Sequence, residues 1–363
     1  MNRRTFVQSG LAASMSAPLL AALRTDKLDE ASEVLARAVA SGQVAAAVLH
    51  VTHCDLSFNR AFGKARSEDA MFLLGSISKP IAVTALMTLF DQGAFQLDDP
   101  LQKYVPQFTG EGKNSVTIRH LLTHVSGLAD QLTDNDALRA RHAGLSEFIE
   151  HAIRAPLHFV PGSRYDYSSM GILLATHVAE LITSMDITSL VDRAVFQPLG
   201  MKHSAQGLGR FSIDEMIPVQ TEFAAVEAGG GNPKAKDWNW NSSYWRKLGA
   251  PWGGTHASAP DIGKFLDELM YEKGTVVRPE TARMMVSNHN PPGITPRGLG
   301  FNLSRFAGAV ACSEKTFGHT GSTGTLALAD PDRQLKCVVL TSLPGTAVQP
   351  HPRELAAIKV FAE

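Results

Sequence analysis

The chain of 363 residues contains few cysteines and almost no net charge, and both shortages exclude classes of protein. Its three cysteines, Cys54, Cys312 and Cys337, lie far apart without metal-ligand spacing, so they form neither a disulfide scaffold nor a zinc site. One disulfide among them, with the third thiol left free, is compatible with the sequence. The 34 basic and 35 acidic residues nearly cancel and form no basic stripe. We therefore expect no nucleic-acid partner, because such binders carry a basic excess or stripe.

Two further absences narrow the choice of function. The longest apolar runs after the N-terminus are broken by Thr, His or Asp, so we expect no stable membrane span. The sequence has neither the Gly-x-Ser-x-Gly elbow of α/β-hydrolases nor a glycine-rich phosphate loop. Apolar residues make up 44 % of the chain and charged residues 19 %, which excludes a disordered protein and provides a large core. The composition therefore describes an enzyme-sized globular protein and leaves its oligomeric state open.

Residues 1–24 have the plan of an export signal. Arg3 and Arg4 precede a stretch of 14 apolar and small residues at 10–23, which is too short to span a bilayer as a helix. The Arg3-Arg4-x-Phe6 pattern resembles a twin-arginine signal. An amphipathic or unstructured N-terminus is the alternative, and no clear Ala-x-Ala site marks a cleavage point. We expect an exported protein that resides in the periplasm.

The apolar pattern changes between the two ends of the chain and its middle. Short apolar runs bounded by turn residues predict strands at residues 44–51, 56–62, 300–306, 324–329 and 335–341. Helical spacing predicts helices at residues 26–40, 81–90, 116–122, 171–182 and 352–362. A sheet made by both chain ends around a helical insertion indicates one α/β unit with a helical lobe. We place the α/β lobe at about 25–75 and 275–363, and the helical lobe at about 76–274.

The first candidate for chemistry is Ser76-x-x-Lys79, at the start of the apolar helix expected at 81–90. Residues three apart lie on one helix face, so the Lys79 amine stands beside the Ser76 hydroxyl. An apolar surrounding lowers the pKa of a lysine and turns its amine into a proton acceptor for the serine. A capping serine next to a snorkelling lysine gives the same spacing, and the motif alone does not separate the two readings.

Two further segments have polar residues at positions that are typical of a functional site. Tyr165 and Tyr167 follow a turn and begin an apolar helix, and a phenol there can move protons if nearby cations lower its pKa from about 10. The glycine-rich segment 317–324 leads into a strand, which allows a substrate backbone to approach the strand edge. The alternatives are tyrosines that pack at a lobe boundary and an ordinary glycine-rich strand entry.

In this order and at these separations, Ser76-x-x-Lys79, Tyr167-x-Ser169 and His319-Thr320-Gly321 resemble the serine β-lactamase and penicillin-binding protein superfamily. The chain is most similar to the class C-like branch of esterases and D-amino-acid peptidases. Supporting phrases run from about residue 28 to 345 and include 97–101, 116–128, 253–261 and 330–333. The resemblance implies a β-lactamase/DD-peptidase-like α/β fold, with an antiparallel sheet flanked by helices and a helical lobe that closes over the serine.

The resemblance also implies a role for each matching residue. Ser76 would attack a carbonyl carbon and become acylated, and Lys79 and Tyr167 would share the general-base and general-acid duty in an order left open. The backbone N–H groups of Ser76 and Ser322 would form the oxyanion hole. Gly321 would keep the strand edge open to substrate, beside His319 and Thr320. No cofactor and no metal are implied.

Two departures from the family pattern bear on the substrate. His319 occupies the position where β-lactamases and DD-peptidases have a lysine that helps to hold the substrate carboxylate. A histidine that is mostly neutral binds an anion more weakly than a lysine does. Ser169 stands where an asparagine amide usually contacts the substrate acyl amide. Both changes favour esters over penicillins.

Four tryptophans and a tyrosine fall in one short stretch, and they either wall an apolar acyl pocket or plug the helical lobe; they are Trp238, Trp240, Tyr244, Trp245 and Trp252. His120 and His124 have metal-ligand spacing, but no glutamate follows His120, so we interpret them as packing residues. The sequence thus predicts a carboxylesterase that hydrolyses small esters with short or medium acyl groups. The alternatives are a D-alanyl-D-alanine carboxypeptidase, a D-aminopeptidase or weak β-lactamase acting on small amides, and a penicillin-binding sensor without turnover.

Overall fold

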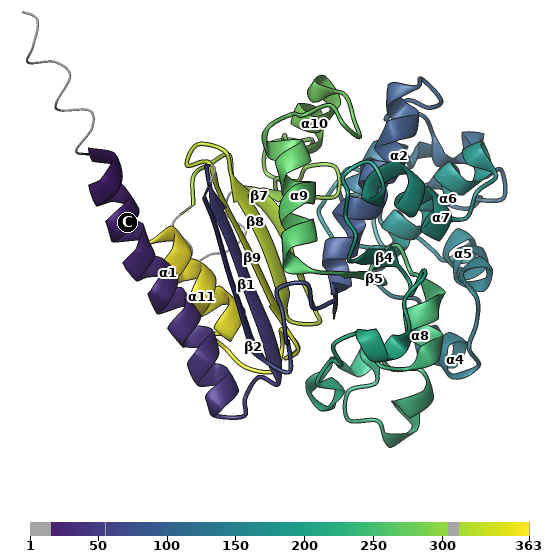
Figure 1. The fold of residues 1–363 in the computed structure, drawn as a ribbon. Coiled ribbons are helices and arrows are strands. Elements are labelled where there is room, and N and C mark those ends of the chain that lie inside the picture. The colour runs from purple at the N-terminus through teal and green to yellow at the C-terminus, as the bar shows by residue number, and fades with distance from the viewer. Residues whose placement is uncertain (1–15, 55, 304–311, 363) are drawn as a thin grey trace, which may run out of the picture.

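A six-stranded antiparallel sheet forms the α/β lobe, and the two ends of the chain meet in its middle (Figure 1). The computed structural model describes residues 16–54, 56–303 and 312–362, and of residues 16–25 only the backbone. The strand order is β2-β1-β9-β8-β7-β6. The strands are β1 (Ala46–His53), β2 (Leu56–Gly63), β6 (Asn302–Leu303), β7 (Phe317–Gly321), β8 (Thr325–Asp330) and β9 (Leu335–Thr341). Strand β1 pairs with β9 from Ala47 opposite Thr341 to His53 opposite Leu335, so the fold class predicted from the sequence is confirmed.

Alternation along the strands divides the core into two layers. Leu49 and Val339 belong to the cluster that packs against α1 (Ser16–Ala40) and α11 (Pro352–Phe361), and these helices cover one face of the sheet (Figure 1). Val48 and Leu340 belong to the larger cluster on the opposite face. Helix α9 (Ala259–Met270) covers that face, although it falls within the range expected for the helical lobe.

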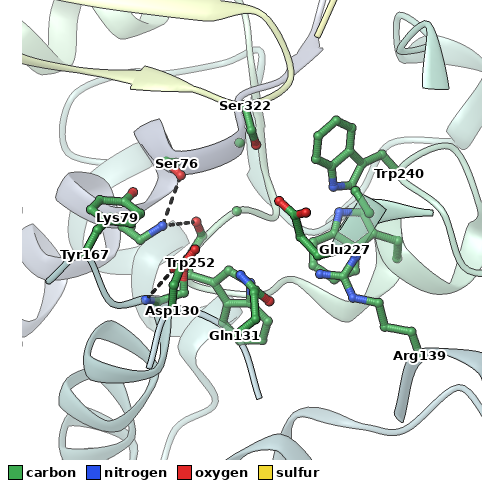
Figure 2. Close-up of a pocket in the computed structure, with 15 residues that line it drawn as sticks. Ser76, Lys79, Asp130, Gln131, Arg139, Tyr167, Glu227, Trp240, Trp252 and Ser322 are labelled. Atoms are coloured by element: carbon green, nitrogen blue, oxygen red, sulfur yellow. Dashed lines mark hydrogen bonds between the residues drawn. The ribbon is translucent and has the colours of Figure 1, made fainter. Parts of the chain in front are cut away.

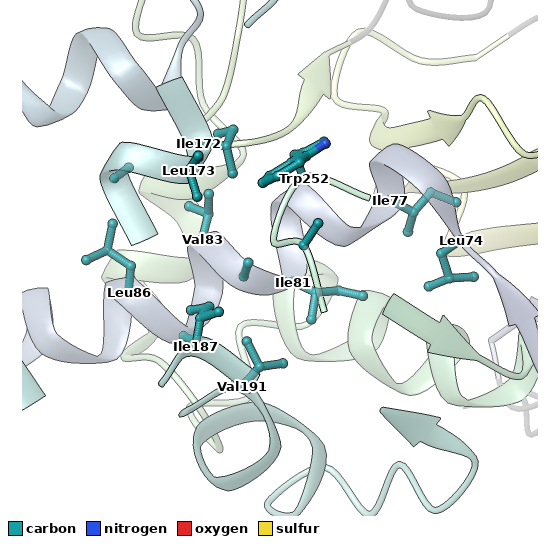
Figure 3. Packing of buried hydrophobic residues seen from close by; sticks show 14 of the residues in the cluster. Leu74, Ile77, Ile81, Val83, Leu86, Ile172, Leu173, Ile187, Val191 and Trp252 are labelled. Atoms are coloured by element: carbon teal, nitrogen blue, oxygen red, sulfur yellow. The ribbon is translucent and has the colours of Figure 1, made fainter. Parts of the chain in front are cut away.

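Helix α2 (Ser78–Asp91) forms the centre of the helical lobe and is apolar nearly all round. Its Ile81 and Leu86 lie in one buried cluster with Ile172 and Ile187 (Figure 3). The other helices are α3 (Ile118–Leu122), α4 (Asn135–Ala140), α5 (Leu145–Arg154), α6 (Ser169–Thr183), α7 (Ile187–Val191), α8 (Ser243–Leu248) and α10 (Pro279–Met285). A small sheet, β3-β5-β4, adds Phe72–Leu73, Thr255–Ala257 and Ser204–Gln206, which are too short for a sequence pattern to reveal.

The structure differs from the sequence-based expectations at the N-terminus and at the cysteines. Helix α1 begins at Ser16, inside the expected export signal, of which residues 1–15 lie outside the described residues. All three cysteines are free, so the disulfide that the sequence allowed is not formed. Of the strand expected at 300–306, only Asn302–Leu303 is found, because 304–306 lie outside the described residues. Within the described part of the chain no single helix is long and apolar enough to cross a membrane. The segments 169–183 and 187–196 together have the necessary length and apolar composition, but they meet at an angle of 84°.

Candidate active site

Ser76 lies in a one-turn 3-10 helix, Gly75–Ile77, directly before α2. Gly75 has a φ of +57°, and a β-carbon at this position would lie 3.1 Å from the amide nitrogen of Ser322. A larger residue would therefore push the two segments apart. Glycine here allows the Ser76 turn to pack against the turn between β7 and β8, which brings the two amides of the predicted oxyanion hole close together.

The glycine-rich segment forms β7 and the turn that leads into β8, as the sequence predicts for its C-terminal end. The Oγ1 atoms of Thr323 and Thr325 donate to the carbonyls of Leu73 and Leu74, each at 2.6 Å. A β-carbon on Gly321 would overlap the Leu74 carbonyl oxygen. Gly321 is therefore also needed for packing against the chain that leads to the serine.

Lys79 is fully buried, with 1 % of its surface exposed, and its Nζ donates to Ser76 Oγ at 3.0 Å and to the Trp252 carbonyl at 3.0 Å (Figure 2). Burial lowers the pKa of Lys79 to about 7, an effect that Arg297 reinforces and Asp130 opposes. A large fraction of the amine is then neutral near pH 7. A neutral amine at this distance can accept the proton of the Ser76 hydroxyl.

The ring of Tyr167 lies close to the Lys79 amine. Lys79 Nζ is 4.6 Å from the Tyr167 ring centroid, and the buried Oη makes no hydrogen bond of ordinary length within the described residues. Burial raises the pKa of Tyr167 above its ordinary value, and Ser76 and Arg297 oppose this only in part. The condition that nearby cations lower the pKa of this phenol is therefore not met, because desolvation outweighs them. The phenol of Tyr167 is therefore protonated at physiological pH.

Ser169 does not offer a free hydroxyl to the cavity. Its N–H and its Oγ both donate to Oδ1 of Asp130, at 2.9 and 2.5 Å. Asp130 also favours the charged form of Lys79. Sequence reasoning missed Asp130, although it follows the family phrase that ends at Leu128 by only two residues. That position was the one signal that could have found it.

His319 is buried on β7 and stays neutral. Its Nδ1 lies 2.7 Å from the Thr320 carbonyl, and its Nε2 lies 3.4 Å from a terminal nitrogen of Arg297. Burial, followed by the charges of Arg297 and Lys79, holds the pKa of His319 well below its usual range. Arg297 is only 3 % exposed, and no sequence motif marked it, because the fold alone brings the segment before β6 to this place.

The charges of Arg297 and Asp130 act on Lys79 in opposite directions, which gives a paired prediction. Arg297→Gln is expected to raise the pKa of Lys79 and to move the acidic limb of the kcat/KM profile to higher pH. Asp130→Asn, which keeps an acceptor for Ser169, is expected to move the same limb to lower pH. The measurement is kcat/KM for one ester between pH 5 and pH 9. Shifts of the same sign in both variants would contradict this electrostatic arrangement.

A cavity of about 140 Å³ opens beside these groups. Ser76, Lys79, Tyr167, Ser169 and Ser322 all line it (Figure 2). Three of the five predicted aromatic residues line it as well, namely Trp240, Trp245 and Trp252.

The other two aromatic residues, Trp238 and Tyr244, do not line this cavity and agree with the alternative that they pack the helical lobe. Tyr244 stacks on His142 with ring centroids 4.6 Å apart and donates to the Ala143 carbonyl at 2.8 Å. Trp238 lines a separate hollow beside Lys234. Both side chains are therefore used to pack the lobe around the cavity.

A match to a known protein family identifies the family of this chain. The model of the Beta-lactamase family matches residues 31–360. The chain belongs to the Beta-lactamase family. It is a serine hydrolase of that family, and the Ser76–Lys79 pair lies in the matched range.

The relatives of this chain include proteins named as an esterase and as a D-alanyl-D-alanine carboxypeptidase. Esterase EstB of Burkholderia gladioli is 36 % identical over 160 residues, a match that covers 40 % of this chain and 40 % of EstB. A protein of Escherichia coli K12, provisionally named a D-alanyl-D-alanine carboxypeptidase, is 25 % identical over 92 % of this chain and 86 % of its own length. The solved structure of EstCE1, a hydrolase with promiscuous acyltransferase activity, has a TM-score of 0.74 at 20 % identity and covers 93 % of this chain and 99 % of its own. That structure supports the Beta-lactamase-family fold.

The remaining predicted site residues lie near the cavity of this Beta-lactamase-family fold. His319 has its ring 6.1 Å from that of Tyr167, and Thr320 follows it on β7. Among the described residues, β6 pairs with β7 only at Phe317 and Gly318. His124 packs against Tyr167 with ring centroids 4.5 Å apart, as its interpretation as a packing residue implies. No group of His, Cys, Asp and Glu in the described ranges could hold a metal ion.

Proposed function

We propose that the protein is a carboxylesterase that cleaves esters of short or medium acyl groups through an acyl-enzyme on Ser76. One observation carries this proposal: a buried amine with a pKa of about 7 lies 3.0 Å from a serine hydroxyl, inside a cavity with tryptophans in its wall. A serine needs such a base to become nucleophilic at neutral pH. A small cavity with three tryptophans in its wall suits a short acyl chain.

The proposed reaction follows from the place of each proton. Neutral Lys79 accepts the proton of Ser76 Oγ as the oxygen attacks the ester carbonyl, and the N–H groups of Ser76 and Ser322 stabilise the oxyanion. Tyr167 donates its proton to the leaving alcohol oxygen and regains a proton from the Lys79 ammonium above its ring. Water then attacks the acyl group by the reverse path, and the serine hydroxyl is restored.

The preference for esters rests on two residues that recognise amides and carboxylates poorly. His319 is uncharged, so it does not attract a substrate carboxylate as a lysine would. The Ser169 hydroxyl is already bound to Asp130 and is shorter than the amide of an asparagine. The similarity to Esterase EstB supports the same choice.

The deciding experiment compares p-nitrophenyl butyrate with a chromogenic cephalosporin, with Ser76→Ala as the control. Steady ester turnover with little cephalosporin cleavage supports the esterase. Fast cephalosporin turnover would make the protein a β-lactamase instead. A burst equal to the enzyme concentration, followed by no turnover, would identify a sensor that stops at the acyl-enzyme.

A cation in place of His319 tests the substrate argument directly. His319→Lys is expected to improve kcat/KM for substrates that carry a carboxylate on the leaving side, relative to the same substrates as methyl esters. We expect a change of this ratio of about tenfold, the usual worth of one charge-assisted hydrogen bond. An unchanged ratio in the variant would show that His319 does not face this part of the substrate.

The second candidate is a D-alanyl-D-alanine carboxypeptidase or D-aminopeptidase, because the relative in Escherichia coli K12 that carries the first name matches 92 % of the chain. Release of D-alanine from a D-alanyl-D-alanine peptide, at a kcat/KM above that for p-nitrophenyl butyrate, would favour it.

We also propose that residues 1–24 direct export to the periplasm. Recovery of the protein only from the cytoplasm of its host would refute this.

A further inference from the structure

Arg139 is a buried cation in the wall of the active-site cavity that the proposed reaction does not use. It lies on α4 and is 2 % exposed, and its guanidinium carbon is 4.0 Å from the ring centroid of Trp245. Its Nε donates to Asn135 Oδ1 at 3.1 Å, whereas the buried Nη1 has no hydrogen-bond partner among the described residues. Burial lowers the pKa of Arg139 to about 10, so the group is still charged at neutral pH.

A buried guanidinium with an unused donor is costly unless something accepts from it. No carboxylate of the described residues forms an ion pair with Arg139, although the carboxylate of Glu227 lines the same cavity (Figure 2). The side-chain oxygen of Gln131, also on this wall, has no partner either. Two carboxylates, Asp136 and Glu227, already favour the charged form of Arg139, so this wall fits a neutral acceptor in the ligand better than a further anion.

The positions of Tyr167 and Arg139 relative to Ser76 indicate which part of a substrate reaches Arg139. The leaving oxygen must lie next to Tyr167, its proton donor, and in Figure 2 Tyr167 and Arg139 lie on opposite sides of Ser76. The acyl chain therefore extends toward the tryptophans and Arg139. We propose that Arg139 is a specificity residue that donates a hydrogen bond to a neutral oxygen, such as a keto group, in the distal part of the acyl chain. This inference rests on the proposed function.

The test compares p-nitrophenyl pentanoate with p-nitrophenyl 4-oxopentanoate, each rate divided by the rate of hydroxide hydrolysis of the same ester. The wild-type protein is expected to prefer the oxo ester by about tenfold in kcat/KM, the size of one hydrogen bond to a charged donor. Arg139→Met is expected to abolish this preference. The matched control is Arg210→Met, because Arg210 is an exposed arginine stacked 4.8 Å from the ring of Phe211. That control should keep the preference.

The inference would be overturned by equal kcat/KM for the two esters in the wild-type protein, or by a preference that survives in Arg139→Met. A faster reaction of the p-nitrophenyl monoester of succinate than of the oxo ester would also overturn it, since the ligand would then be an anion.

A binding measurement separates this inference from the proposed function. Methyl 4-oxopentanoate and methyl pentanoate are titrated into Ser76→Ala, and the fluorescence of Trp245 and its neighbours reports occupancy. Tighter binding of the oxo ester that is lost in Ser76→Ala/Arg139→Met supports the inference even if no ester is turned over, which would refute the esterase alone. Equal binding overturns the inference.

Discussion

Ser76→Ala is expected to lower kcat for p-nitrophenyl butyrate by at least about 10⁴-fold, because it removes the hydroxyl that lies 3.0 Å from the Lys79 amine. The Ser76 side chain accepts one hydrogen bond, from Lys79, and is not part of the apolar core. The variant should therefore fold, with an unchanged circular dichroism spectrum. The assay is steady-state turnover at pH 8 with spontaneous hydrolysis subtracted.

The matched control for this variant is Ser67→Ala, which removes the same hydroxyl from an exposed position away from the cavity. It should keep wild-type turnover. If Ser76→Ala kept more than a few per cent of the wild-type rate, the nucleophile would have to be another residue.

Lys79→Met is expected to lower kcat/KM by about 10³-fold, because it removes the base and keeps the length of the side chain. In the wild-type protein kcat/KM should rise with pH through about 7, since burial lowers the pKa of Lys79 to that value and only the neutral amine accepts a proton. The variant should lose this limb. The measurement is a pH profile of both proteins, with the exposed Lys64→Met as the control.

A different base would give a different profile. If the phenolate of Tyr167 accepted the first proton, activity would keep rising above pH 9, because burial raises the pKa of that phenol. That outcome, or a Lys79→Met variant with an unchanged limb near pH 7, would contradict the assignment of Lys79 as the base.

The sheet and its helices follow from local patterns, which is why they could be predicted. Strand β9 was expected at 335–341 and is found at Leu335–Thr341, because its run of apolar residues is buried on both faces. Strand β1 and helices α2, α6 and α11 carry equally clear patterns. The small sheet escaped prediction because strands of two or three residues, such as Phe72–Leu73, are made by tertiary contacts alone.

The proposed catalytic pair could be predicted from the sequence because Ser76 and Lys79 are neighbours on one turn. The charges that tune it were not visible. Asp130 and Arg297, which act on the pKa of Lys79, come from separate segments of the chain, and only the fold brings them close to it. Arg139 on α4 reaches the cavity in the same way. The sign of the Tyr167 pKa shift was also beyond the sequence, since it depends on how deeply the phenol is buried.

The most direct test of the central claim is the mass of the intact protein, measured after rapid acid quench of a reaction with a slowly hydrolysed ester such as p-nitrophenyl pivalate. An acyl-enzyme on Ser76 predicts a mass increase of one pivaloyl group, located by proteolysis on the peptide that contains Ser76, and no increase in Ser76→Ala. An unmodified wild-type protein during steady turnover, or a pivaloyl group on another residue, would contradict the mechanism.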